Sequence, residues 1–152
     1  MADSPRLGID WGKARIGVAA AGAHSTFAYP VTTVPAGQDG LRQLLEVVEE
    51  YGPTVIYVGL PIDLKGIRGI AAEFIEAKAI GLASALQDVE VRLVDERMST
   101  AAASRSLGSV GRSVKAQRGI IDQAAAVVIL QTALDAEERE GAPVGSLVEG
   151  GN

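Results

Sequence analysis

The chain has 152 residues, a length that fits one domain and suffices to bury a stable core without disulfide or metal staples. Its 47% hydrophobic and 22% charged residues are typical of a globular protein in water. No cysteine and a single histidine exclude a disulfide framework, a thiolate zinc site and a histidine-rich metal site. Apolar runs fall short of the roughly 18 residues of a membrane span, and no signal peptide is evident. We therefore expect a cytoplasmic protein with no membrane partner.

In chain order, the pattern begins with two strands joined by a short glycine-containing turn, which is typical of a β-hairpin. The third strand contains Pro30, so we expect it at a sheet edge or a bulge. The two later strands each follow a helix. The predicted strands are Arg6–Asp10, Arg15–Ala20, Phe27–Val34, Thr54–Gly59 and Val89–Val94.

Helices are predicted where apolar residues recur at helical spacing. They cover Gly37–Tyr51, Ile70–Leu86, Ser99–Leu107 and Gly119–Glu138. We expect loops at Leu60–Ile67 and at Gly108–Gln117, and the glycine and serine content of the second predicts mobility. The Gly/Pro tail at Gly141–Asn152 is predicted to be disordered.

This order predicts an α/β fold with a five-stranded mixed sheet flanked by helices. Because crossover connections are right-handed, the later strands should run parallel to the first. Their carboxyl ends then bring Asp10, Gly59 and Glu96 to one edge of the sheet, where α/β proteins place ligand sites.

Three acidic residues stand at the ends of these elements. Asp10 closes the first strand, Glu96 follows the fifth, and Asp122 lies in the first turn of an otherwise apolar helix. Converging carboxylates repel each other unless a cation lies between them, and Mg²⁺ prefers oxygen ligands. The pattern suggests a metal-dependent enzyme acting on phosphates. Alternatives stay open: Asp10 can form an Asx turn, Asp122 can complement the helix dipole, and spacing does not choose between Asp95 and Glu96.

Positive charge gathers in one stretch, although the net charge of −5 argues weakly against bulk nucleic-acid binding. Between Glu96 and Asp122 there is no acidic residue, and the basic residues there are Arg97, Arg105, Arg112, Lys115 and Arg118. Such a stretch fits a phosphate-backbone footprint, or a solvated loop whose charges serve solubility. Lys13 and Arg15 in the first hairpin either contact phosphate near the metal or are exposed hairpin charges.

Four segments together resemble the YqgF family, whose members are known as Holliday junction resolvases or pre-16S rRNA nucleases. They are Leu7–Ala19 (LGIDWGKARIGVA), Val58–Gly66 (VGLPIDLKG), Val94–Ala101 (VDERMSTA) and Ile121–Leu130 (IDQAAAVVIL), in family order. The resemblance runs from about Arg6 to Leu134 and implies an RNase H-like nuclease domain, which we place at residues 1–140.

The resemblance implies that Asp10, Glu96 and Asp122 are catalytic and hold one or two Mg²⁺ or Mn²⁺ ions, and it favours Glu96 over Asp95. It also matches Arg15 and Arg97 to basic positions of the family. Two departures concern loop contacts with substrate. Ala14 replaces the family's usual lysine, and the usual asparagine and acidic residue of the second motif are Asp63 and Lys65.

We therefore predict a metal-dependent nuclease that acts on precursor rRNA or branched DNA, with the family favouring rRNA. The basic residues expected to hold the substrate backbone are Lys13, Arg15, Arg97, Arg112, Lys115 and Arg118. A junction resolvase should be a homodimer, because two symmetric cuts are needed. One competing hypothesis is a non-catalytic RNA-binding ribosome-assembly factor. The other is an actin-like phosphotransferase, but the chain is too short for the two-domain ATP clamp that those enzymes use.

Overall fold

A computed structural model describes residues 4–62, 69–96 and 114–150, and it describes side chains in the last range from Asp122 onward. Within these residues a six-stranded mixed sheet has the order β3-β2-β1-β4-β5-β6. Its strands are β1 (Arg6–Trp11), β2 (Arg15–Ala21), β3 (Tyr29–Pro35), β4 (Val55–Leu60), β5 (Glu90–Asp95) and β6 (Ser146–Val148). The helices are α1 (Gly40–Tyr51), α2 (Ile70–Ser84) and α4 (Val114–Glu140).

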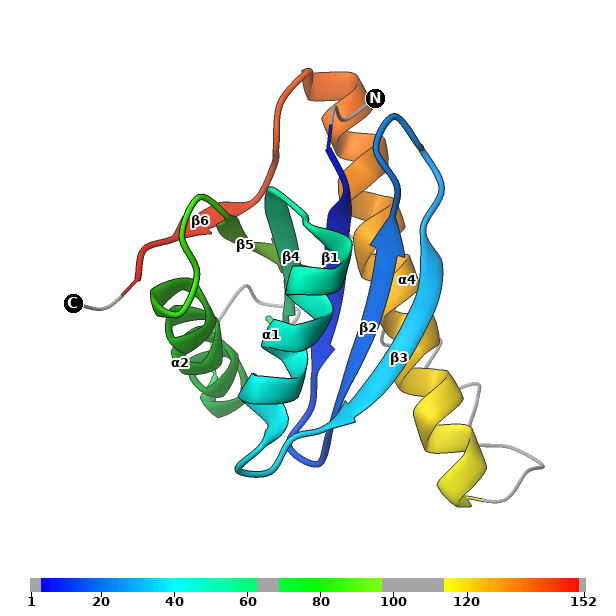
Figure 1. Cartoon of the computed structure of the whole chain (residues 1–152), viewed down its shortest axis with the longest axis vertical. Coiled ribbons are helices and arrows are strands. Elements are labelled where there is room, and N and C mark those ends of the chain that lie inside the picture. Colours follow the sequence, from blue (N-terminus) through cyan, green and yellow to red (C-terminus); the bar gives the residue numbers. More distant parts are fainter. Residues whose placement is uncertain (1–3, 63–68, 97–113, 151–152) are drawn as a thin grey trace.

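The helices form two layers around the sheet. Helices α1 and α2 cover one face and α4 covers the other (Figure 1). Strands β4 and β5 run parallel to β1, as the crossover rule predicts, while β2 and β3 are antiparallel. The predicted α/β class with a mixed sheet flanked by helices is therefore confirmed. The carboxyl ends of β1, β4 and β5 lie at one edge of the sheet, beside the amino-terminal end of α2 (Figure 1).

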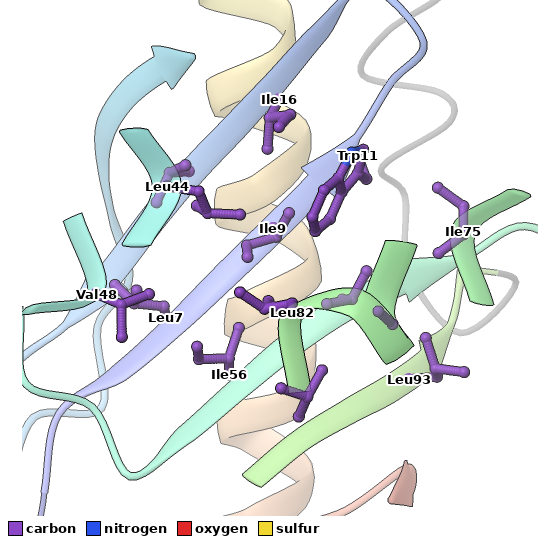
Figure 2. Packing of buried hydrophobic residues seen from close by; sticks show 14 of the residues in the cluster. Leu7, Ile9, Trp11, Ile16, Leu44, Val48, Ile56, Ile75, Leu82 and Leu93 are labelled. Carbon is purple, nitrogen blue, oxygen red and sulfur yellow. The ribbon is translucent and has the colours of Figure 1, made fainter. Parts of the chain in front are cut away.

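Residue alternation along the strands builds two separate cores. Leu7, Ile9 and Trp11 of β1 belong to the cluster beneath α1 and α2, which Figure 2 shows with Leu44 of α1. The intervening β1 residues face α4, whose alanines and leucines form the second cluster with Tyr57 of β4. Because side chains alternate across a strand, one face of β1 supplies apolar packing and the other carries Asp10.

The C-terminal segment corrects both the strand number and the predicted tail. Ser146–Val148 forms β6, which pairs antiparallel with β5, so the sheet has six strands where five were predicted. The prediction of a disordered tail is therefore wrong for Ser146–Val148. Gly145, with φ of 77°, turns the chain, and Arg92 of β5 donates to its carbonyl at 3.4 Å. A three-residue strand is too short to show periodicity, so only its partner strand specifies it.

Helix α4 begins earlier than predicted, at Val114. Residues 114–117 are thus helical, which corrects part of the predicted loop Gly108–Gln117 and moves Asp122 from the first turn into the body of the helix. Lys115, Ala116 and Gln117 are strong helix formers, so the helix extends through them despite Gly119. The rest of that loop and the predicted helix Ser99–Leu107 lie outside the described residues. None of the described helices is long and apolar enough to cross a membrane.

A buried ion pair fastens the far end of α4 to the sheet. Arg6 donates from Nε and Nη2 to the two carboxylate oxygens of Glu137, at 3.1 and 3.0 Å, and both side chains are about nine-tenths buried. The Tyr57 hydroxyl donates to Glu137 Oε2 at 2.7 Å and accepts from the Val144 amide at 3.3 Å. Burial, followed by the hydrogen bond to Glu137, raises the pKa of Tyr57 well above its usual value of 10.0.

Candidate active site

Two of the three predicted carboxylates meet in one pocket at the carboxyl edge of the sheet. Asp10 lies on β1 with 6% of its surface exposed, and Glu96 directly follows β5. Both line a pocket of about 160 Å³, which we call the catalytic pocket after the predicted role of these two carboxylates. Its other walls include Trp11, Gly12, Lys13, Gly59, Pro61 and Phe74. Parallel pairing of β1, β4 and β5 produces this meeting, because it places the strand ends side by side.

Gly59 makes the approach of Glu96 possible. A Cβ atom on Gly59 would lie 3.1 Å from Glu96 Oε1 and 2.5 Å from Ile129 Cδ1. Any larger residue would therefore displace the carboxylate or push α4 away from β4. The sequence analysis placed Gly59 at the site edge as the last residue of a predicted strand and gave it no role of its own. The signal that identifies its role is a glycine inside a β-strand, which marks a close approach of another group.

Asp122 reaches the same end of the sheet from α4. Gly17 of β2 pairs with Asp10 of β1, and a Cβ atom on Gly17 would lie only 2.1 Å from the backbone oxygen of Asp122. The helix backbone at Asp122 thus rests on the strand position opposite Asp10. Its carboxylate has another partner, however, because Arg15 Nε donates to Oδ2 at 2.8 Å.

The structure therefore unites Asp10 and Glu96 in the catalytic pocket and ties Asp122 to Arg15. Among the side chains described, no three acidic or histidine residues are grouped closely enough to hold one metal ion together. The lining carboxylates offer only oxygen ligands, which suits a hard divalent cation such as Mg²⁺ or Mn²⁺. Asp10 and Glu96 fit such an ion, whereas Asp122 is paired with Arg15 in this structure.

The predicted substrate-binding cations fall into three groups. Lys13 is exposed at the rim of the catalytic pocket, where it can meet a phosphate. Arg15 contacts Asp122 in this structure. Lys115 and Arg118 lie on α4 with side chains that are not described, and Arg97 and Arg112 fall outside the described residues.

The strand order and the two pocket carboxylates fit a nuclease of the RNase H-like class. The chain belongs to the family described as RuvX: Holliday junction resolvase, whose model matches residues 4–136. This confirms the resemblance seen in the four sequence motifs.

Named relatives agree with this membership. The chain is 46% identical over 130 residues to a protein of Cutibacterium acnes, covering 86% of this chain and 81% of that protein. It is 48% identical over 147 residues to a protein of Streptomyces coelicolor, covering 95% of this chain and 87% of that protein. Both are named "Putative pre-16S rRNA nuclease". A solved structure of Thermus thermophilus RuvC with a Holliday junction substrate is similar with a TM-score of 0.58 at 14% identity, covering 92% of this chain and 98% of that chain, and shows the likeness of fold.

Proposed function

We propose that this protein is a divalent-metal-dependent nuclease that hydrolyses phosphodiester bonds in precursor 16S rRNA. The observation that carries the proposal is the shared pocket of Asp10, on β1, and Glu96, directly after β5, at the edge where this fold class binds ligands. The names of the curated relatives support the choice of RNA. The proposal includes a cytoplasmic location and a catalytic domain within residues 1–140.

In this proposal Asp10 and Glu96 would hold one or two Mg²⁺ or Mn²⁺ ions, and Asp122 would be a third oxygen ligand. A bound ion supplies an activated water and neutralises charge on the leaving oxygen. Burial of Asp10 keeps its carboxylate fixed, so it can orient an ion without rearranging. Lys13 and Arg15 neutralise phosphate charge at the rim, joined by Arg97, Arg112, Lys115 and Arg118 from the basic stretch.

Arg15 has two roles in this scheme. It neutralises Asp122 in this structure, and it would be available to the substrate backbone where Asp122 served as a ligand of an ion. The ion pair is partly open to solvent, with the Arg15 side chain 34% exposed, so the exchange requires no unfolding.

A Holliday junction is the second candidate substrate, favoured by the description of the matching family. It would require a homodimer, because two strands must be cut symmetrically. A non-catalytic RNA-binding factor is the third candidate, and it predicts binding that does not depend on the carboxylates.

The deciding experiment measures cleavage by wild type, Asp10→Asn and the matched control Asp95→Asn. Asp95 is the neighbouring carboxylate, and it does not line the catalytic pocket. Each protein is offered an RNA with a precursor 16S 5′ end and a four-way DNA junction, with Mg²⁺ or Mn²⁺. We expect RNA cleavage by wild type and Asp95→Asn and its loss in Asp10→Asn. Preferred junction cleavage would support the second candidate, and equal binding without cleavage by all three proteins would support the third.

A further inference from the structure

A second pocket adjoins the catalytic pocket on the side of α1 and α2. It measures about 300 Å³ and is hereafter the α1–α2 pocket. Its lining includes Trp11, Ile16, Gly37, Leu41, Lys78 and Gly81. Trp11 lines both pockets, so the two cavities meet across this side chain at the end of β1. Figure 2 shows Trp11 on the sheet face that α1 and α2 cover.

Two glycines keep the α1–α2 pocket open without serving the packing of the protein. A Cβ atom on Gly37 or Gly81 would meet nothing within 4 Å. Gly40, at the same opening, differs because its Cβ atom would lie 2.6 Å from the carbonyl oxygen of Pro35. Gly81 lies in the interior of α2, where glycine is among the least favourable residues. Because Gly81 has no side chain, space remains between α1 and α2.

The walls of the pocket combine apolar with polar surface, which includes the Gln38 amide, and one cation lies at the boundary. Trp11, Ile16 and Leu41 supply the apolar part. Lys78 Nζ lies 5.6 Å from the centre of the Phe74 ring, and Phe74 lines the catalytic pocket. The ammonium group of Lys78 therefore lies between the two cavities.

We propose that the α1–α2 pocket receives the base of the unpaired nucleotide next to the scissile phosphate. This inference rests on the proposed function and adds to it that the substrate strand is unpaired beside the cleaved bond. A nucleobase has large apolar faces, which suit the walls, and adjacent nucleotides are joined by a phosphate, which suits the cation at the boundary. A base inside a duplex cannot enter such a pocket, so the strand must be single-stranded or splayed there.

The test measures binding of a short single-stranded RNA to the Asp10→Asn protein, which holds the substrate uncleaved. A series of RNAs carries one abasic nucleotide at each position in turn, and the dissociation constant is measured by fluorescence anisotropy. We expect one position at which loss of the base weakens binding by roughly tenfold. Adding Gly81→Leu fills the pocket, so the intact RNA should bind roughly tenfold more weakly and the abasic position should no longer matter.

Two matched variants sharpen this test. Ala85→Leu adds the same side chain at an exposed position of the α2 end, outside the pocket lining, and should keep the abasic signature. Lys78→Gln should lower the slope of log Kd against log salt by about 0.7, the share of one phosphate contact in a single strand. Arg139→Gln removes one positive charge at the far end of α4 and should not change that slope.

An abasic penalty that is equal at all positions, or that persists unchanged in Gly81→Leu, would overturn the inference. These outcomes are independent of cleavage. If the protein does not cut RNA but Gly81→Leu removes the effect of the abasic position, the base pocket is supported and the proposed nuclease activity is not. If the protein cuts RNA but no abasic position shows an effect that depends on Gly81, the nuclease activity is supported and the base pocket is not.

Discussion

The two faces of the sheet are packed in opposite ways. Facing α4, the strands present glycine at Gly8, Gly17 and Gly59, and a Cβ atom at any of them would lie within 2.5 Å of an atom of the helix. Facing α1 and α2, they present leucine, isoleucine, valine and tryptophan, and an open pocket remains between the two helices. The comparison shows how one sheet can hold a carboxylate-bearing helix rigidly on one side and leave space for a ligand on the other.

The largest effect is expected from Gly17→Val, which breaks the close contact on the α4 face. The added Cβ atom would lie 2.1 Å from the backbone oxygen of Asp122, so α4 must move. We expect a loss of about 3 kcal/mol in unfolding free energy, at the upper end of overpacking effects, and loss of RNA cleavage. Urea denaturation and a cleavage assay measure both. Gly22→Val is the control, because a Cβ atom there meets nothing within 4 Å.

A smaller effect is expected from Tyr57→Phe, at the far end of the α4 face. Losing the hydroxyl removes its hydrogen bond to Glu137 and should cost on the order of 1.5–3 kcal/mol, because the acceptor is charged. Chemical denaturation at pH 8 measures this cost. The exposed Tyr29 provides the control Tyr29→Phe, which should unfold like wild type.

The same residue predicts a pH dependence. The pKa of Tyr57 is raised in the folded state, so above pH 10.0 the unfolded chain loses this proton first. The stability that Tyr57 contributes is thus complete below pH 10.0 and declines as the pH rises above it. The stability difference between wild type and Tyr57→Phe should therefore be constant below pH 10.0 and shrink as the pH rises from 10.0 toward about 11. A constant difference would show that Tyr57 ionises equally in both states.

Next in size is Arg15→Gln, which tests whether Arg15 competes with metal for Asp122. Without the guanidinium, the carboxylate should be free to bind an ion, and the affinity for Mn²⁺ should rise about fivefold, the equivalent of about 1 kcal/mol for a partly exposed pair. Titration calorimetry without nucleic acid measures this. An unchanged affinity would mean that Asp122 does not bind the ion, and Arg42→Gln on the exposed face of α1 is the control.

The smallest effect is expected from Gly81→Ala on the open face. The added methyl group meets no atom within 4 Å, and alanine favours a helix interior over glycine by about 1 kcal/mol. The variant should therefore be slightly more stable than wild type in thermal melts. Gly40→Ala provides the contrast and should be less stable, because its Cβ atom would lie 2.6 Å from Pro35 O.

The sequence predicted the parts of the fold that local patterns encode. The β1–β2 hairpin, the edge position of the strand containing Pro30 and the common edge of Asp10, Gly59 and Glu96 are confirmed. Strand β6 could not be predicted, because its three residues depend on the exposed edge of β5. The start of α4 was missed because glycine and spaced charges resemble a loop.

The residues of the candidate site could be predicted from the sequence, but the ion pair that one of them forms could not. Motif spacing brings Asp10 and Glu96 to one place, because parallel strands end together. The Arg15–Asp122 ion pair joins residues 107 positions apart in sequence, and no local pattern reports such a contact. The metal-binding role of all three carboxylates stays a prediction.

Both margins of the sheet are closed to an additional strand, which bears on how copies of this chain could associate. At one margin β3 carries Pro30 and Pro35, which lack the amide hydrogen that pairing needs. At the other, the three residues of β6 offer too short a template. The sheet therefore resists the edge-to-edge pairing that leads to fibrils. A dimer of this chain would therefore form through helices or loops, and helix packing would set the relative orientation of its two sites.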